Sequence, residues 1–455
     1  MSAAARFAEH ALTTRFEDLP PEVVQAAKTF ILDSIGVGIA GSSVAGADGL
    51  LAVASGWGDK PEAQVWGRPD RLAAPAAAFL NAWQMHNQEF DCLHEAAVVH
   101  ALASVLPASL AAAEQFGGID GRALITAVAV GADIAAGLGL ASRTGFRFFR
   151  PATAGGFGAV AAAGRILGLD RAALEAAFAW QLAQASGTMQ AHTEGSPILP
   201  VQVGFNARAA LQSCALAQVG FAPAQEVFEG AYGYLPLFEG AFDLAPVLSD
   251  LGHTWRIAEF SHKPFPAGRA THGGIEGVMA LRARRGFSVD DVAEIVISAP
   301  PLIRRLVGRP PVVNPGPSYA RLCMAYLVAK VLQHGKITIA QFSDEARADP
   351  NTLALAGLVR VVDDGNPDPN ALAPQSVSVR LMDETILIWR GETMLAHPSR
   401  PLSREQCLTK FRHCLEFSAA PLCADAAALL QGQIDRLEEL QDVRALTRLA
   451  AGSFV

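Results

Sequence analysis

Charged residues are scarce in this sequence, and basic residues do not predominate among them. Only 18% of the 455 residues are charged, and 36 Lys and Arg stand against 44 Asp and Glu, for a net charge of −8. A nucleic-acid-binding protein normally carries a basic face, so we expect no nucleic-acid partner. A few local basic groups can still hold an anionic substrate. Hydrophobic residues make up 51% of the chain, which excludes a disordered or fibrous protein and predicts a compact one.

Cysteine pairs and the common nucleotide-binding and metal-binding motifs are also missing. The six cysteines include no CxxC pair, which favours reduced, buried thiols over a disulfide framework or a zinc site. The chain contains neither GxxxxGK[ST] nor HExxH. The glycines of residues 154–164 do not follow a credible strand, so a dinucleotide-binding fold is not predicted. The segment GSPILP (195–200) is not a nucleophile elbow.

No run in the sequence reads as a signal peptide or a strong membrane span. The first twenty residues contain Glu9, Glu17 and Asp18 and lack an apolar core. The most membrane-like run, residues 123–141, contains Asp133 and several glycines, and Ala replaces most of the Leu that lipid favours. We therefore expect a buried helix there, and a cytoplasmic protein with no membrane partner.

Hydrophobic periodicity divides the chain into helical and mixed regions. Residues 2–251 repeat Ala-rich apolar segments at helical spacing, and small residues of this kind let helices approach closely. Residues 292–300 and 376–391 are rich in β-branched residues and alternate, so they are expected to be strands. Helical patterns return after residue 403. The sequence predicts a mainly α fold, in which a discontinuous all-helical domain (1–255 and 396–455) carries a smaller α+β domain (256–395).

Titratable residues concentrate in the segment MHNQEFDCLHEAAVVH, between two Ala-rich helices. Burying so many titratable side chains costs free energy unless they are paired, so their concentration here calls for a structural or functional explanation. It fits a general acid/base cluster in which carboxylates raise the pKa of an imidazole, a solvated loop, or a metal site, and residue chemistry leaves all three open. Its members are His86, Glu89, Asp91, His94, Glu95 and His100.

Two basic segments are further candidates for an anion site. In the first, two prolines stiffen the backbone between Lys263 and Arg269, and Arg269 offers two parallel donors to a carboxylate. In the second, Arg143, Arg147 and Arg150 precede a Gly-rich helix start whose free N–H groups would attract an anion. A surface linker and a solvated arginine cluster are the respective alternatives.

Taken in order, these segments resemble the MmgE/PrpD family, which includes 2-methylcitrate dehydratase, cis-aconitate decarboxylase and iminodisuccinate epimerase. EFDCLHEAAVVHA (89–101) is similar to the family's DFDDTHxGxxxHP, and RPATAGGFGAVAAAGRILGLD (150–170) to HPTATxGxFGAAAAAGKLLGLD. HKPFPAGRATH (262–272) resembles KPYPxCRxTH, and YARLCMAYLVAKVL (319–332) resembles EAKFSLPYxVAxAL. Residues 204–238 match a further long stretch. The resemblance covers most of the chain.

The resemblance implies a large all-helical domain, a smaller α+β lid, a homodimer and an active site between the domains. Members of the family act without a metal or an organic cofactor on small di- or tricarboxylic acids. They move a proton at the carbon next to a carboxylate, and water or carbon dioxide leaves or the centre is inverted. This chemistry needs a base, a proton donor and cations that stabilise carboxylate charge.

The resemblance also implies roles for individual residues. His100 stands at the family's active-site histidine and is expected to do acid/base work, while Lys263 is expected to stabilise carboxylate or enolate charge. The catalytic set implied is His100, Lys263, Asp91 and Tyr326. The substrate-binding set implied is Glu89, His94, Arg150, Gln202, Arg269 and His272, and no metal ligand is implied.

Several positions depart from the family pattern. Arg150 replaces the histidine of HPT, and the segment usually written KRLHxG reads LPVQVG, so that its histidine is Gln202. Cys92 replaces the second aspartate of FDD, Leu93 replaces its threonine, and Gly268 follows KPFPA. We therefore expect a pocket that differs in charge or shape from that of a 2-methylcitrate dehydratase.

The function predicted from the sequence is a cofactor-independent lyase of the dehydratase type acting on a small di- or tricarboxylic acid. An epimerase of the iminodisuccinate type and a decarboxylase of the cis-aconitate type are the alternatives within the enzymes. A non-catalytic homologue that only binds a carboxylate is the alternative from another class, because the histidine of HPT and the basic groups of KRLH are missing.

Overall fold

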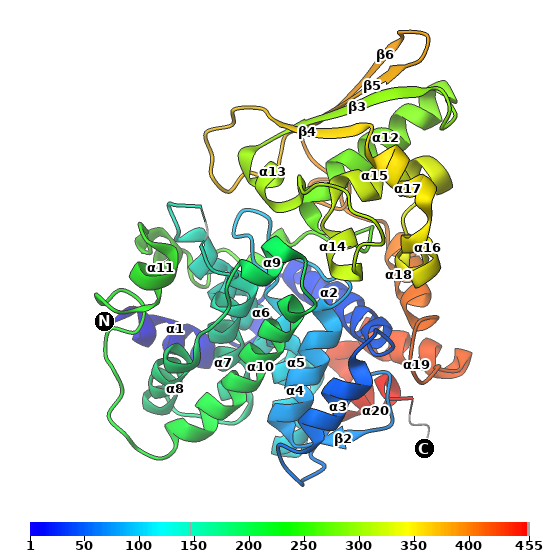
Figure 1. Ribbon diagram of the computed structural model, residues 1–455. Coiled ribbons are helices and arrows are strands. Elements are labelled where there is room, and N and C mark those ends of the chain that lie inside the picture. Colours follow the sequence, from blue (N-terminus) through cyan, green and yellow to red (C-terminus); the bar gives the residue numbers. More distant parts are fainter. Residues whose placement is uncertain (146, 453–455) are drawn as a thin grey trace.

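The computed structural model describes residues 1–145 and 147–452, and most of them are helical (Figure 1). The helices of the N-terminal part are α1 (Ala3–Thr13), α2 (Pro21–Gly41), α3 (Ala47–Ser55), α4 (Ala74–His86), α5 (Leu102–Phe116), α6 (Gly121–Leu140), α7 (Ala154–Ile166), α8 (Arg171–Gln184), α9 (Gln190–Glu194), α10 (Ile198–Ala217) and α11 (Ala245–Asp250). A short hairpin of β1 (Ala63–Gln64) and β2 (Arg71–Leu72) lies between α3 and α4. The sequence analysis predicted that the N-terminal part is entirely helical, and this hairpin shows that it is not. Strands of two residues are too short to produce a detectable alternation in the sequence.

Helices α5, α6, α7 and α10 pack together in the centre of the helical part, where small residues let their axes approach closely. A Cβ atom on Gly158 of α7 would lie 2.2 Å from the carbonyl oxygen of Gly131 in α6, so only glycine permits this approach. Asp120 caps α6 by accepting from the N–H of Ala123 at 2.8 Å. The expected buried helix over residues 123–141 is confirmed as α6, whose side chains between Leu124 and Gly139 are buried.

Two helices are long and apolar enough to cross a membrane by length and composition alone. They are α2 and α6, and 72% and 89% of their most apolar stretches are buried inside the protein. Helix α2 packs against α4 and against α18 (Arg404–Leu415) near the C-terminus, and α6 packs against α7 and α5. Core helices of this kind give only weak evidence for a membrane.

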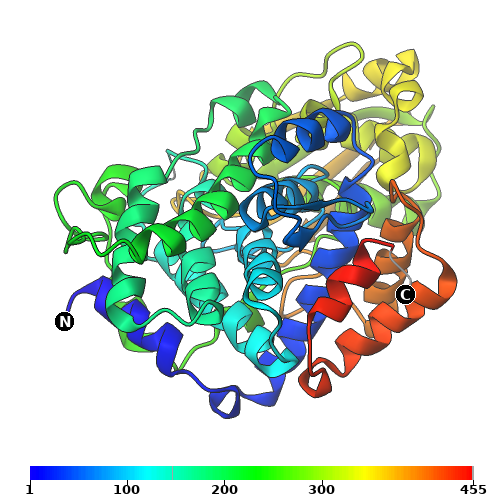
Figure 2. The same cartoon turned by 90° about the horizontal axis from the view of Figure 1, so that it is seen from below.

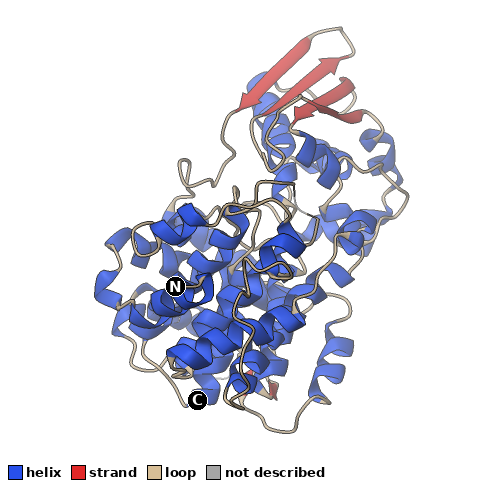
Figure 3. Ribbon diagram, turned by 90° about the vertical axis from the view of Figure 1, so that its left-hand side faces the viewer, coloured by secondary structure: helices blue, strands red, loops and turns tan. Residues whose placement is uncertain are grey.

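A four-stranded sheet lies at one end of the molecule, apart from the helical body (Figures 1 and 3). Its strands are β3 (Val292–Ala299), β4 (Val359–Asp363), β5 (Gln375–Leu381) and β6 (Ile386–Gly391), in the order β4-β3-β5-β6. β3 and β4 are parallel and the other pairs are antiparallel, with Ile297 opposite Val361 and Val377. The strands expected at 292–300 and 376–391 are confirmed, the second run being a hairpin, whereas β4 was missed because only five residues of it pair.

Helices cover one face of this sheet and connect it to the helical body. They are α12 (His272–Arg285), α13 (Pro301–Val307), α14 (Pro317–Arg321), α15 (Met324–His334), α16 (Asp344–Ala348) and α17 (Pro350–Ala356). α12 contacts β5 and β6, while α15 contacts α12 and β4. The helical pattern of residues 319–332 is interrupted between α14 and α15, at Leu322 and Cys323.

The C-terminal helices return to the N-terminal half of the chain. α18 (Arg404–Leu415) and α19 (Ala424–Asp435) pack beside α2, and α20 (Arg444–Ala450) packs on α5 (Figure 2). A mainly helical fold is thus confirmed. The domain boundaries at residues 256 and 396, and the action of the sheet-bearing part as a lid, stay predictions.

Candidate functional site

A cavity with an empty volume of about 530 Å³ lies where the loop after α4 meets the segment that leads into α12. Its polar lining consists of Glu89, His100, His192 and Arg269. The rest of its lining consists of Leu93, Val98, Phe149, Pro151, Met189, Gly268, Ala270, Leu306, Val307, Leu322 and Leu372.

The loop that follows α4 holds an unusual backbone conformation at two positions. Glu89 and Val98 both have a φ of 51°, in the left-handed region that a β-branched valine strongly disfavours. The surrounding structure holds the loop in place: Leu93 and Ser261 exchange backbone hydrogen bonds of 3.1 and 2.8 Å. Strain that is fixed in this way is typical of functional segments.

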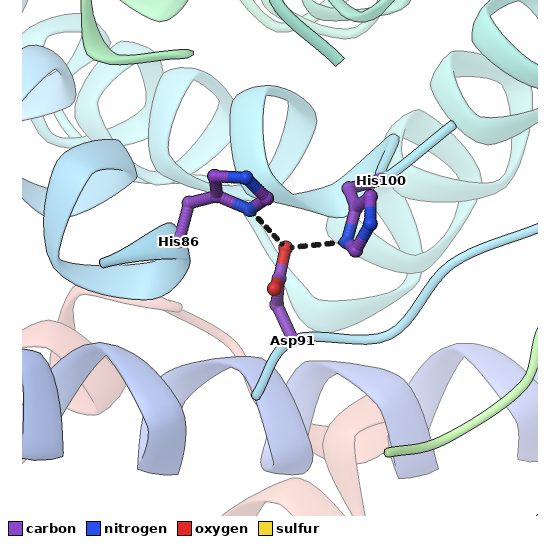
Figure 4. Close-up of side chains that lie close together, drawn as sticks. All are labelled: His86, Asp91 and His100. Atoms are coloured by element: carbon purple, nitrogen blue, oxygen red, sulfur yellow. Dashed lines mark hydrogen bonds and ion pairs between the residues drawn. The ribbon is translucent and has the colours of Figure 1, made fainter. Parts of the chain in front are cut away.

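Asp91 joins His86, the last residue of α4, to His100 of this loop (Figure 4). Its Oδ2 atom lies 2.9 Å from Nδ1 of His86 and 2.9 Å from Nδ1 of His100. Because a carboxylate oxygen accepts, both Nδ1 atoms carry hydrogen and donate to it. The Nε2 atom of neutral His100, a residue that lines the cavity, is then left with a free lone pair.

Lys263 neutralises the carboxylates from a fully buried position. Its Nζ donates to Oε2 of Glu89 at 2.7 Å and lies 3.5 Å from Oδ1 of Asp91, and its side chain has 0% exposure. Lys263 is therefore brought together with Glu89, Asp91 and His100, three other residues that the sequence analysis assigned to the site. It lies behind Glu89, however, and is not part of the cavity wall.

The pKa values of the two histidines that share Asp91 are shifted in opposite directions. Burial lowers the pKa of His100 below 6.5, with Lys263 and His86 adding to that effect and Asp91 opposing it. Burial also acts to lower the pKa of His86, but the negative charges of Asp91 and Glu89 outweigh it and raise the pKa above 6.5. Opposed shifts of this kind distinguish the group better suited to act as a base, His100, from its neighbour His86.

Both carboxylates of the cluster are ionised at neutral pH. Burial alone would raise the pKa of Glu89, but Lys263, followed by the two histidines, lowers it to about 2. The pKa of Asp91 is likewise held well below 3.8, because His100, His86 and Lys263 overcome its burial. Glu89 therefore presents a negative charge at the cavity wall.

The same cluster has the composition of a metal site but is already paired internally. One ligand atom each from His86, Asp91 and His100 lie within 4.8 Å of one another. Both Nδ1 atoms donate to Asp91, and the ammonium group of Lys263 lies 3.5 Å from the same carboxylate. A cation placed there would meet both donor hydrogens and a positive charge, so the described residues fit a hydrogen-bonded acid/base cluster better than a metal ligand set.

Arg269 lines the cavity, but the protein itself occupies its guanidinium group. Nε donates to Oε1 of Glu95 at 2.9 Å, and Nη2 lies 2.8 Å from the same oxygen. Nη1 donates to the carbonyl of Leu395 at 2.8 Å and to Nδ1 of His272 at 3.2 Å. Nε2 of His272 donates to the carbonyl of Ala267, and burial keeps the pKa of His272 well below 6.5. Both residues therefore fix the segment 262–272.

Tyr326, which was predicted to be catalytic, lies outside the cavity wall. Its hydroxyl donates to the carbonyl of Gln341 at 2.6 Å. It lines a separate hollow with Arg347 and Asp349. The geometry gives Tyr326 the role of fixing the turn after α15.

The remaining substrate-binding predictions also fall away from the cavity. His94 pairs with Oε2 of Glu259 at 2.8 Å, and Gln202 accepts from the backbone N–H of Thr188 at 2.7 Å. Arg150 is 1% exposed, and its Nε donates to Oε2 of Glu239 at 2.8 Å. These three side chains hold parts of the protein together at these contacts.

Two residues near the cavity were not singled out as site residues from the sequence. His192 lines the cavity, and burial, aided by Arg309, lowers its pKa to about 4. Nη2 of Arg309 donates to the carbonyl oxygens of His192 and Leu306 at 2.8 and 3.2 Å. His192 stands alone among small and polar residues in QAHTEG, so no local pattern pointed to it.

Comparison with protein families finds two matches that together span most of the chain. Residues 5–247 match the MmgE/PrpD N-terminal domain, and residues 265–436 match the MmgE/PrpD C-terminal domain. The second match extends through α18 and α19, beyond the α+β unit delimited from the sequence.

Individual relatives are similar to this chain over nearly their whole length. A cis-aconitate decarboxylase of Mus musculus is 28% identical over 458 residues, covering 95% of this chain and 90% of the relative. The cis-aconitate decarboxylase of Homo sapiens is also 28% identical, with 95% and 91% covered. A cis-aconitate decarboxylase of Aspergillus terreus is 27% identical, with 87% and 86% covered. All three carry the name of a decarboxylase.

Proposed function

The chain belongs to the MmgE/PrpD family, and from that membership we propose that it is a lyase that transfers a proton at the carbon next to a carboxylate of a small acid. The decarboxylase relatives support the lyase class. The observation that carries the mechanism is the His100 imidazole, which lines the cavity while its Nδ1 donates to the buried carboxylate of Asp91.

The paired imidazole is suited to accept and return a proton. With Nδ1 donating to Asp91, Nε2 is the atom available to a substrate, and the lowered pKa keeps it unprotonated at neutral pH. Once His100 gains a proton, the charge of Asp91 stabilises the imidazolium, as in the histidine–aspartate pair of serine proteases. Lys263 acts through Glu89 and Asp91 by holding both ionised, instead of touching substrate as the sequence suggested.

The relatives favour loss of carbon dioxide over the dehydration that the sequence analysis placed first. In a decarboxylation the bond from carbon to the carboxylate breaks, carbon dioxide leaves, and the electron pair is taken up as a new C–H bond with a proton from an imidazolium. In a dehydration His100 would instead remove a proton, and the hydroxyl group of the next carbon would leave as water after receiving a proton from an acid such as the imidazolium so formed. Both reactions need an acid/base group at the cavity wall, which starts unprotonated in a dehydration and protonated in a decarboxylation.

Epimerisation and simple binding remain the alternatives. An epimerase needs two acid/base groups that reach the two faces of one carbon. Lys263 is enclosed behind Glu89, whereas His192 lines the same cavity as His100 and is the candidate for the second group. A homologue that only binds a carboxylate would show no proton transfer at all.

Proton NMR in D₂O tests the proposal directly. The purified protein is incubated with citrate, 2-methylcitrate, cis-aconitate, iminodisuccinate, malate and isobutylsuccinate, and deuterium incorporation, new alkene signals and released carbon dioxide are followed. Wild-type protein is expected to exchange a proton next to a carboxylate of at least one acid, and His100→Gln, which cannot take up a proton, is expected to lose that exchange. Exchange that is equal in the two proteins would contradict the role of His100. Chelator-treated protein is expected to keep its activity, since we propose a cofactor-free reaction.

We also propose that the protein acts as a homodimer. Several large apolar side chains on α10 and the segment after it are exposed, which is a feature of protein interfaces. They are Ile198, Phe205, Leu216, Val219 and Phe221. Light scattering should give twice the mass of one chain, and a Phe221→Glu variant should shift that mass toward the monomer.

A further inference from the structure

The cavity offers little positive charge that a substrate can use. Arg269 is the one Lys or Arg among the described residues that line it, and Glu95 and backbone carbonyls occupy its guanidinium. Lys263 is enclosed and paired with Glu89. Glu89 itself faces the cavity and is ionised, since its pKa is about 2. A substrate with three carboxylates would meet a negative charge there, with little compensation.

Most of the wall cannot solvate a carboxylate. Met189, Leu306, Leu322 and Leu372 line the cavity together with Val98 and Phe149. A carboxylate pressed against these side chains would lose water without gaining a hydrogen bond, which is strongly unfavourable. An alkyl group in the same place would gain free energy from burial.

Arg309 lies beside the cavity wall without lining it, and it is one of the cations there that keep donors to spare. Its Nε and Nη1 atoms are buried and have no hydrogen-bond partner within residues 1–145 and 147–452. Its Nη2 donates to the carbonyls of two cavity-lining residues, His192 and Leu306, so the guanidinium lies against this part of the wall. A guanidinium with free donors is suited to one carboxylate.

From these observations we infer that the substrate is an acid with no more than two carboxylates and an apolar substituent, which the wall of Met189, Leu306 and Leu372 receives while Arg309 binds a carboxylate. This inference rests on the proposed function and narrows it. It excludes a tricarboxylate as the preferred substrate, although the relatives are named for one.

A matched pair of acids separates charge from shape. Tricarballylate carries a CH₂–CO₂⁻ arm where isobutylsuccinate carries CH₂–CH(CH₃)₂, and the two arms have the same branching. Binding is measured by calorimetry, and deuterium exchange next to a carboxylate by proton NMR. Isobutylsuccinate is expected to bind at least about tenfold more tightly, a difference that corresponds to about 1.4 kcal/mol, and to exchange its proton.

The outcomes distinguish this inference from the proposed function. Equal or tighter binding of tricarballylate, with exchange, would overturn the inference and support the lyase. Tighter binding of isobutylsuccinate without exchange of either acid would support the inference about the ligand and contradict the lyase. Failure to bind either acid would overturn the inference.

Two variants test the residues assigned to specificity. Met189→Lys places a cation on the partly exposed part of the apolar wall, and it is expected to improve tricarballylate binding over isobutylsuccinate, while Met189→Gln, of equal length and neutral, is expected not to. Arg309→Met is expected to weaken binding of isobutylsuccinate about tenfold or more, raising KM more than it lowers kcat, with partial recovery in Arg309→Lys. Unchanged binding in Arg309→Met would remove Arg309 from the site.

Discussion

Replacing Lys263 by methionine should destabilise the folded protein by about 3–5 kcal/mol at pH 7.5, the usual cost of leaving a buried charge without its partner. Methionine has nearly the same length but cannot pair with Glu89 or Asp91, which lie 2.7 and 3.5 Å from Nζ. The pKa of Glu89 gives a second measure. The difference between 4.5 and about 2, at 1.36 kcal/mol per pH unit, corresponds to about 3 kcal/mol of stabilisation of its ionised form.

The pH dependence of this contribution has a definite sign. Because folding lowers the pKa of Glu89, its stabilising contribution is fully present above pH 4.5 and is lost as the pH falls toward 2. In Lys263→Met the largest opposing factor is gone, so burial should raise the pKa of Glu89 and reduce or reverse this contribution.

Urea unfolding followed by circular dichroism measures the loss, with the slope of the transition as a check that the unfolded states are comparable. The matched control is the double variant Lys263→Met/Glu89→Gln, in which both charges are absent. Its loss in free energy of unfolding should be smaller, by about 1–3 kcal/mol, than the sum of the losses measured for the two single variants. A loss below about 1 kcal/mol in Lys263→Met, or strict additivity in the double variant, would refute the buried ion pair as described.

Three further outcomes follow from the site. The rate of α-proton exchange should rise with pH with a midpoint below 6.5, because His100 must lose its proton through a pKa that burial has lowered; a midpoint above 6.5 would contradict its role as the base. Asp91→Asn should reduce exchange by a factor of about 10² to 10⁴, since a neutral amide cannot stabilise the imidazolium, and a smaller loss would mean that His100 works without it. Tyr326→Phe removes the hydrogen bond to Gln341 and should therefore lower the free energy of unfolding by about 1 kcal/mol, while the exchange rate stays nearly unchanged. A folded variant without exchange activity would instead show that Tyr326 is catalytic.

Local sequence patterns predicted the helices and pointed to the loop that contains Asp91 and His100. The density of titratable groups around Asp91 and His100 marked the acid/base loop, and these residues hydrogen-bond to one another within nine positions of the chain. Periodicity also located β3 and the β5–β6 hairpin, because each of those runs is long enough to alternate.

Contacts across long sequence separations could not be predicted in this way. Lys263 and Glu89 are 174 positions apart. The sequence therefore identified Lys263 as a positive charge but could not identify Glu89 as the carboxylate that pairs with it. Arg269 is likewise 174 positions from Glu95, and this pairing uses the donors that were expected to hold a substrate. His192 and Arg309 come together through a backbone carbonyl, which leaves no pattern in the side chains.

Arg150 and Glu239 are expected to change only together during evolution. Both side chains are 1% exposed, and Tyr234 donates to the second carboxylate oxygen at 2.9 Å, so Glu239 depends on Arg150 for charge neutrality. Histidine alone at position 150, as in the HPT segment of the family, would weaken that compensation and leave a buried carboxylate. We expect relatives with that histidine to lack an acid at the position of Glu239, which makes the pair a covariation marker for the branch of the family to which this chain belongs.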